Sequence, residues 1–292
     1  MFRTRFWGVR GTIACPNFNF LKFGGNTSCV TIECDSDLLI FDAGTGIRSL
    51  GNQMIKEKKN EASLFFSHTH WDHINGFPFF KPAYINGVKL DIFCGNLKAH
   101  NTEIFEVLSS QMQNPTFPVP IDVMEASMNY KDFDAGVSFQ LKENIQIVTA
   151  PLNHPKGATG YRVNYNNFSV CYVTDTEHHI GERDQNILKL IENSDLVIYD
   201  STYTDEEYPK YKGWGHSTWQ EGVRLCTEAN VKKFAIFHHD PSHDDEIMTK
   251  IKKQAKEMWD GTFIATEGVE VNLKYNLMGN RVLEFSRFNS AC

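Results

Sequence analysis

The chain has 292 residues, of which 41% are hydrophobic and 13% aromatic, and its formal net charge is −7. This apolar content is sufficient for a packed core, so the composition excludes a disordered or fibrous chain. The negative net charge argues against a protein that binds long nucleic acids, because neutralising their phosphates requires a basic surface. A small anionic substrate remains compatible with it, since bound metal ions can supply local positive charge.

The predicted elements form two groups of strands, each accompanied by helices. The first group has strands at 2–7, 28–34, 37–42, 63–67 and 89–94, and helices at about 45–59 and 98–112. Residues 114–130 are expected to be an extended connection, because three prolines fall within six positions there. The second group has strands at 145–150, 161–165, 168–174, 195–200 and 233–238, and helices at about 183–193, 217–230 and 243–259. A few terminal strands complete the chain, and the order predicts a four-layer αββα sandwich of two mixed sheets with helices outside.

The cellular location and domain count follow from simple exclusions. The seven cysteines form no CxxC pair, which is typical of free thiols in a reducing compartment. Residues 1–11 contain no apolar signal region, and no stretch approaches the ~20 apolar residues of a membrane span. No change of composition marks a domain boundary. We therefore expect one cytoplasmic domain over residues 1–292 without membrane contact.

A dense group of metal-ligand side chains follows the strand at 63–67, in the sequence FFSHTHWDHINGF. His68 and His70 are two positions apart, so their side chains point the same way in an extended segment. Asp72 and His73 follow shortly after and can face a neighbouring point. This spacing predicts one pair of ligands for one metal and a second pair for another. The absence of cysteine from the group favours an open hydrolytic site over a closed structural zinc site.

Three further candidate ligands come directly after apolar strands. His154 follows the strand at 145–150, Asp175 ends the strand at 168–174, and His238 ends the last strand of the second group. Side chains at strand ends can converge on one edge of a sheet. With the first group they complete two sites of three or four ligands each.

These motifs, in this order and with Asp42 in FDAGTG, make the chain resemble the metallo-β-lactamase-fold metallohydrolases over nearly its whole length. The resemblance implies an αββα sandwich with two metal ions at one edge. The first metal would be held by His68, His70 and His154. The second would be held by Asp72, His73 and His238, with Asp175 bridging both. Asp42 would orient one of these ligands through a hydrogen bond.

Within this superfamily the chain is most similar to ribonuclease Z and its phosphodiesterase relatives. Residues 213–239, GWGHSTWQEGVRLCTEANVKKFAIFHH, resemble the ribonuclease Z segment around its His-Ser-Thr motif. Residues 195–204 resemble its His-Glu-Ala-Thr element, with Asp200 in place of the Glu and Tyr199 in place of the His. A β-lactamase proper would lack the His-Ser-Thr motif, so antibiotic hydrolysis is not expected.

One departure separates the chain from ribonuclease Z. That family carries a long tRNA-clamping arm between the equivalents of His154 and Asp175, whereas only 20 residues separate them here. Other stretches resemble bacterial cyclic-nucleotide phosphodiesterases of this fold: RFWGVRGT at 5–12, FGGNTSC at 23–29, WDHINGFPFF at 71–80 and FHHDPSHDD at 237–245. The expected substrate is therefore a small phosphodiester, and long nucleic acid is not expected as a partner.

The resemblance implies a binuclear phosphodiesterase that converts a 3′,5′-cyclic nucleotide to the nucleoside 5′-monophosphate. Two metal ions would generate a hydroxide and neutralise charge on the phosphoryl oxygens. His216 is the candidate general acid, Asp200 would hold its imidazole, and Asp72 would serve the chemistry as a ligand. The ligand set suits zinc, and also manganese or iron. A homodimer is expected from the resemblance alone.

Several alternatives stay open at this point. The enzyme could instead be a ribonuclease Z-like endonuclease that processes RNA 3′ ends, a non-catalytic nucleotide-binding sensor, or a thioester or lactone hydrolase. Asp200 could simply cap a turn at the end of its strand. Substrate contact is undecided for His178, His179, His239 and His243. One or two of the aromatic side chains near the motifs could stack on a nucleobase while the others pack in the core: Trp71, Phe77, Phe79, Phe80, Trp214 and Trp219.

Overall fold

The computed structural model describes residues 1–288 of the chain, which divides into two compact units. Unit 1 combines Met1–Gly8, Asn26–Asp134 and the C-terminal segment from Glu267. Unit 2 combines Val9–Gly25 and Ala135–Thr266. The chain therefore passes from one unit to the other more than once. The single-domain organisation expected from the composition stays a prediction.

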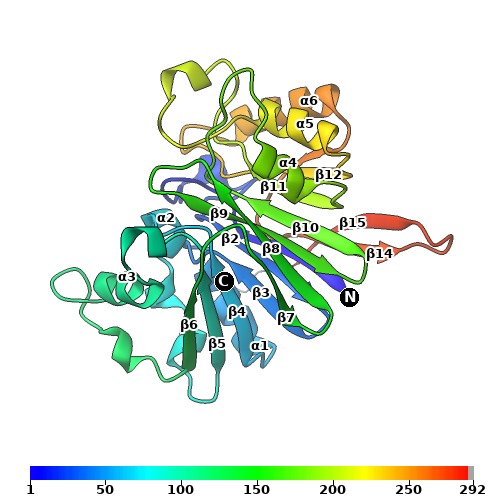
Figure 1. The fold of residues 1–292 in the computed structure, drawn as a ribbon. Coiled ribbons are helices and arrows are strands. Elements are labelled where there is room, and N and C mark those ends of the chain that lie inside the picture. The colour runs from blue at the N-terminus through cyan, green and yellow to red at the C-terminus, as the bar shows by residue number, and fades with distance from the viewer. Residues whose placement is uncertain (289–292) are drawn as a thin grey trace. The chain divides into compact units, whose positions relative to one another are not determined.

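Unit 1 is built on a mixed sheet of eight strands, in the order β15-β14-β1-β2-β3-β4-β5-β6 (Figure 1). The strands are β1 (Phe2–Gly8), β2 (Cys29–Cys34), β3 (Asp37–Phe41), β4 (Glu61–Phe66), β5 (Lys89–Cys94), β6 (Ser127–Asp132), β14 (Val269–Tyr275) and β15 (Arg281–Arg287). Strands β3 to β6 run parallel, and the other pairs are antiparallel. Strand β1 pairs with β14, with Phe2 opposite Leu273, so the two ends of the chain share one sheet.

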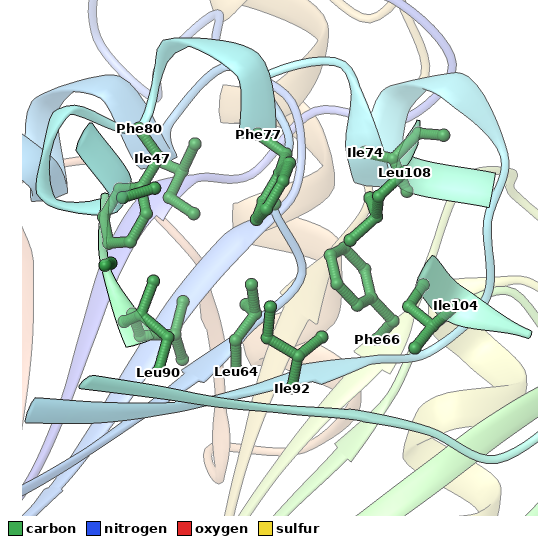
Figure 2. Close-up of a cluster of buried hydrophobic side chains, with 14 of the residues drawn as sticks. Ile47, Leu64, Phe66, Ile74, Phe77, Phe80, Leu90, Ile92, Ile104 and Leu108 are labelled. Carbon is green, nitrogen blue, oxygen red and sulfur yellow. The ribbon is translucent and has the colours of Figure 1, made fainter. Parts of the chain in front are cut away.

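The core of unit 1 lies between this sheet and its helices α1 (Ile47–Lys56), α2 (Trp71–Ile74) and α3 (Ile104–Gln111). Figure 2 shows Leu64 and Phe66 of β4 on the same face of the sheet, with Leu64 beneath Phe77 and Phe66 beneath Leu108. Residues two apart on a strand share a face, which explains why both side chains are fully buried. This packing fixes the C-terminal end of β4, where the first group of candidate ligands begins.

Unit 2 is built on a mixed sheet of seven strands, in the order β13-β12-β11-β10-β9-β8-β7. The strands are β7 (Ser138–Lys142), β8 (Ile145–Leu152), β9 (Ala158–Tyr165), β10 (Phe168–Val173), β11 (Leu196–Asp200), β12 (Lys233–Phe237) and β13 (Thr262–Ile264). Helices α4 (Gln185–Ile191), α5 (Trp219–Glu228) and α6 (Asp245–Met258) pack on this sheet around a second apolar core (Figure 1). The side chains of Asp184, Thr218 and Asp244 cap their N-termini.

The structure confirms two mixed sheets and most predicted elements, and it corrects one helix and one connection. The predicted helix 98–112 is wrong over its first turns, because Asn101 adopts a left-handed conformation with φ of 52°. Helix α3 starts only after a capping box formed by Glu103 and Glu106. The extended connection predicted at 114–130 contains a 3₁₀ helix, Ile121–Val123, and the beginning of β6.

Two sequence expectations concern location. In residues 1–288 no helix is both long and apolar enough to cross a lipid bilayer. The six cysteines of this part of the chain are free and buried, and Cys292 lies outside the described residues.

Candidate metal centre

Unit 1 brings its four candidate ligands together at the end of β4. The imidazole ring of His68 lies 4.4 Å from that of His70 and 4.3 Å from that of His73, measured between ring centroids. Asp72 and His73 belong to the single-turn helix α2, and Asp72 Oδ2 lies 3.2 Å from His73 Nε2. All but His70 are buried. A chain that leaves a rigid strand and turns at once into a helix thus gathers four ligand groups.

Asp42 is hydrogen-bonded to this group of candidate ligands. It follows β3 with a left-handed φ of 62°, a conformation that Asp tolerates better than most residues. Its carboxylate accepts hydrogen bonds from Ser67 N at 2.7 Å and Ser67 Oγ at 2.8 Å. It also lies 2.8 Å from His73 Nδ1, which is the contact with a ligand expected from the sequence. With Nδ1 engaged, Nε2 of His73 is the nitrogen left for a metal.

Unit 2 places its three candidate ligands directly after strands. His154 follows β8, Asp175 follows β10, and His238 follows β12. Asp175 Oδ1 lies 3.9 Å from His154 Nε2, and Asp175 Oδ2 lies 3.3 Å from His238 Nε2. All three side chains are buried. Asp175 thus directs one carboxylate oxygen toward each imidazole, as a bridging carboxylate would.

His216 lies beside these ligands and is paired with a buried carboxylate. Its Nδ1 is 2.9 Å from Asp200 Oδ2 and 3.8 Å from Asp175 Oδ1. Its ring stacks on that of His238 at 4.9 Å. Burial acts to raise the pKa of Asp200, but the adjacent His216 together with His238 outweighs burial and lowers the pKa below its ordinary value. The contact between Asp200 and His216 is the one expected from the sequence, while its catalytic role stays a prediction.

Asp200 is more than a turn cap. Its carboxylate also accepts hydrogen bonds from Thr202 N at 3.1 Å, as a capping residue would, and from Thr176 N at 3.1 Å. The carboxylate therefore joins the strand end of β11 to the segment after Asp175. The same group serves the turn and orients the imidazole of His216.

The environment of the histidines fits a metal site. In each unit the Nδ1 of candidate ligand histidines faces a protein oxygen: Asp42 for His73 at 2.8 Å, the carbonyl of Gly215 for His154 at 2.7 Å, and Thr202 Oγ1 for His238 at 3.0 Å. Metal-binding histidines almost always use their second nitrogen in this way, because the bond fixes the tautomer and the ring orientation. In unit 2, His154, Asp175 and His216 each offer one nitrogen or oxygen atom able to bind a metal, and these atoms lie within 4.8 Å of one another.

Sequence reasoning missed Glu177 and the carbonyl of Gly215. Glu177 accepts hydrogen bonds from Gly213 N and Gly215 N, both at 2.8 Å, and so fixes the loop whose carbonyl holds His154. The repeated glycines of GWGHST were the available signal, because Gly213 and Gly215 both adopt positive φ. The carboxylate that holds the loop lies 36 to 38 residues away in the chain and carries no such signal.

The remaining histidines are mostly engaged with the protein. His178 Nδ1 lies 2.8 Å from Ser217 Oγ, and burial, assisted by Arg224, lowers the pKa of His178 to about 4. His239 and His243 are buried, with Nε2 of each 2.9 Å from the Ala265 carbonyl and from Glu207 Oε1, respectively. His179 is exposed. The aromatic residues considered for base stacking differ in exposure: Phe77, Phe80 and Trp219 are buried, whereas Trp71, Phe79 and Trp214 are exposed.

Comparisons with known proteins agree with this fold. The family model described as the beta-lactamase superfamily domain matches residues 38–239. Ribonuclease Z of Picrophilus torridus is 24% identical over 93% of this chain and 96% of its own length. The metallo-beta-lactamase fold protein YhfI from Bacillus subtilis is similar with a TM-score of 0.70, at 17% identity over 92% of this chain and 98% of its own. The short form of human tRNase Z covers the same shares at 17% identity, with a TM-score of 0.63.

The structural likenesses confirm the predicted metallo-β-lactamase fold, and the family match covers more than half of the chain. The His and Asp groups of the two units supply the ligand chemistry that such a fold uses. The chain therefore belongs to the beta-lactamase superfamily, as a metal-dependent hydrolase of the metallo-β-lactamase fold.

Proposed function

We propose that this protein hydrolyses phosphodiesters with two divalent metal ions. The ligands would be the residues that the sequence singled out: His68, His70, Asp72, His73, His154, Asp175 and His238. When bound, two such ions make a water molecule acidic enough to attack at neutral pH and neutralise charge on the phosphoryl oxygens. Zinc is the first candidate, because imidazole and carboxylate ligands without cysteine suit open zinc sites, and manganese and iron are alternatives.

The observation that carries the proposal is the pairing of His216 with Asp200 beside a candidate ligand. Asp200 holds Nδ1 of His216 at 2.9 Å, so Nε2 is the nitrogen that can carry a proton to the substrate. Expelling an alkoxide from a phosphodiester requires that proton. A positioned general acid contributes about 10²–10⁴ in rate. Thioester or lactone hydrolysis would not need His216 in this role, which favours phosphodiester chemistry.

The first candidate substrate is the 3′ end of an RNA. Support comes from the curated relative that spans nearly the whole chain and is named ribonuclease Z. The intact His-Ser-Thr motif at His216 agrees with it. The comparisons therefore give more support to an RNA 3′ end as substrate than to a cyclic nucleotide.

A small phosphodiester is the second candidate, and a specific structural feature favours it. Between His154 and Asp175, where the resemblance to ribonuclease Z implies a tRNA-clamping arm, the chain forms only β9 and β10 joined at Asn166 and Asn167. Both asparagines have positive φ, as in a tight two-residue hairpin turn. With a net charge of −7, the protein also lacks an overall basic balance for long RNA.

A substrate panel tests the proposal. The protein would be stripped with a chelator, reloaded with zinc or manganese, and given pre-tRNA, cyclic AMP and bis-p-nitrophenyl phosphate. We expect metal-dependent cleavage of at least one diester, with turnover lowered about 10²–10⁴-fold in His216→Ala. Metal content should be unchanged in that variant. Diester cleavage that persists at full rate in the stripped protein would refute the proposal, and loss of metal from His216→Ala would make His216 a ligand.

The panel also separates the two substrates. Preferential cleavage of pre-tRNA would support the ribonuclease Z-like function and count against the small-diester reading. Preferential cleavage of cyclic AMP would support the small-diester function and count against the ribonuclease Z-like function. Binding of cyclic AMP without turnover in the metal-loaded protein would instead indicate a nucleotide sensor.

A further inference from the structure

The loop Tyr211–His216 of unit 2 has a fixed backbone. It connects the 3₁₀ helix Tyr208–Lys210 to the segment before α5. Glu177 accepts the N–H groups of Gly213 and Gly215, and Trp214 N donates to the Tyr211 carbonyl at 3.1 Å. Two charge-assisted hydrogen bonds to one carboxylate are stronger than neutral ones and hold both sides of Trp214.

The carboxylate that holds the loop is itself anchored. Glu177 N donates to the Asn153 carbonyl at 2.7 Å, and Asn153 Nδ2 donates to the Glu177 carbonyl at 2.8 Å. Asn153 immediately precedes His154, and Glu177 comes two residues after Asp175. The position of the loop is therefore tied directly to the segments that carry two candidate ligands.

This rigid loop exposes a large aromatic ring. Trp214 is 63% exposed, although its backbone is held on both sides. An indole is among the side chains that gain most from burial, so the fold leaves that gain unused here. Rigid aromatic side chains provide contact area at a low cost in conformational entropy, which suits a binding surface.

A row of rings joins Trp214 to the candidate general acid. Trp214 meets Tyr211 edge to face at 5.5 Å, and Tyr211 stacks on Tyr203 at 4.5 Å with an interplanar angle of 6°. Tyr203 in turn lies 6.1 Å from the ring of His216. Along the chain, Trp214 is two residues from His216, and two residues span at most about 7 Å. The backbone of Trp214 is therefore close to that of His216, and the two side chains belong to the same short loop.

We propose that Trp214 is a stacking site for the nucleobase adjacent to the scissile phosphodiester. This inference rests on the proposed function, and it adds that the substrate carries an aromatic base next to the reacting phosphate. Every base has a π-face, so the site would bind nucleotides without strong base preference. It applies to an RNA end and to a cyclic nucleotide alike.

The test compares two phosphates that differ only in the base, AMP and ribose 5-phosphate. Calorimetric titration of the metal-loaded protein measures the dissociation constant of each. We expect Trp214→Ala to weaken AMP binding about 5- to 150-fold, because stacking contributes about 1–3 kcal/mol per base. Ribose 5-phosphate should bind as in the wild type. Trp214→Phe should restore part of the AMP affinity, since a smaller ring can still stack.

Phe18→Ala provides a matched control. Phe18 is 79% exposed in unit 2, in the 3₁₀ helix Phe18–Phe20, which packs beside α6. Removing this ring should leave the binding of both phosphates unchanged. A loss of AMP affinity in Phe18→Ala equal to that in Trp214→Ala would show a general effect of surface aromatics and would overturn the inference.

The remaining outcomes are distinguishable from failure of the proposed function. AMP that does not bind, unchanged AMP affinity in Trp214→Ala, or an equal loss for both phosphates would overturn the stacking site, even if diester hydrolysis persists. Selective loss of AMP affinity in a protein that hydrolyses no diester would support the stacking site and refute the phosphodiesterase. Selective loss together with a raised KM for base-containing diesters would support both.

Discussion

The substitution Gly215→Ala should release His154 from its orientation. Gly215 has a φ of 84°, and its carbonyl accepts the hydrogen bond from His154 Nδ1 at 2.7 Å. A Cβ at this position would lie 2.3 Å from His154 Nδ1 and 2.4 Å from Pro155 Cδ. Both distances are far below contact, so the imidazole or the loop must move. Losing the partner of a metal-binding histidine costs about 10- to 100-fold in metal affinity.

Gly213→Ala is the matched control. Gly213 also has a positive φ, 92°, and its N–H also binds Glu177, but a Cβ there would meet no atom within 4 Å. Both variants carry the left-handed backbone penalty of about 1–2 kcal/mol. Only Gly215→Ala also displaces His154. The difference between the two variants therefore isolates the effect on the ligand.

The assay measures zinc affinity by competition with a chromophoric chelator, alongside thermal unfolding of the metal-free proteins. We expect both variants to unfold at lower temperature than the wild type, and only Gly215→Ala to lose metal affinity. Equal zinc affinities in the two variants would refute the orienting role of the Gly215 carbonyl. Unfolding of Gly215→Ala at the temperature of the wild type would show that the loop absorbs the added methyl group.

Three other predictions follow from the structure. Asp42→Asn should lower metal affinity about 10- to 100-fold in the chelator assay, because one amide oxygen cannot replace both carboxylate oxygens, of which Oδ1 accepts from Ser67 N and Oδ2 faces Ser67 Oγ and His73. Unchanged affinity would contradict this prediction. Burial lowers the pKa of His178 from 6.5 to about 4, so His178 stays neutral in the folded state. In urea unfolding, the wild type should therefore lose stability relative to His178→Gln as the pH falls from about 6.5 to 4. Parallel stability curves for the two proteins would contradict this prediction. Leu64→Ala, in the core of Figure 2, should cost about 2–5 kcal/mol of unfolding free energy, whereas Leu277→Ala at a fully exposed position should cost nothing measurable.

The parts of the site that follow strands could be predicted from the sequence. Apolar runs mark strands, and His154, Asp175 and His238 each stand where such a run ends, as the structure confirms. A contact of Asp42 with one of the candidate ligands and a contact of Asp200 with His216 were expected from the family resemblance, and both are present, the first with His73. The assignment of all seven ligands to two metal ions stays a prediction, as do the homodimer and the cytoplasmic location.

The contacts that depend on loops could not be predicted. Glu177 looks like any polar residue after a strand, because its partners Gly213 and Gly215 come near only when the chain has folded. Strand β7 was missed for a related reason: in Ser138–Lys142 polar and half-buried residues alternate, without the continuous apolar run of a buried strand. Helix α3 was predicted too long because the left-handed turn at Asn101 has only a weak sequence signal.

The pairing of β1 with β14 bears on how the protein is made. Residues 2–5 pair with residues 270–273, so a ribosome must synthesise the chain through residue 273 before β1 can acquire its second neighbour. Until then the nascent chain presents an open strand edge, which is a template for aggregation. Such distant pairing slows folding, because a long loop must close first. Truncation before Val269 would leave that edge permanently open, so a chain shortened there should depend on chaperones and accumulate as inclusion bodies.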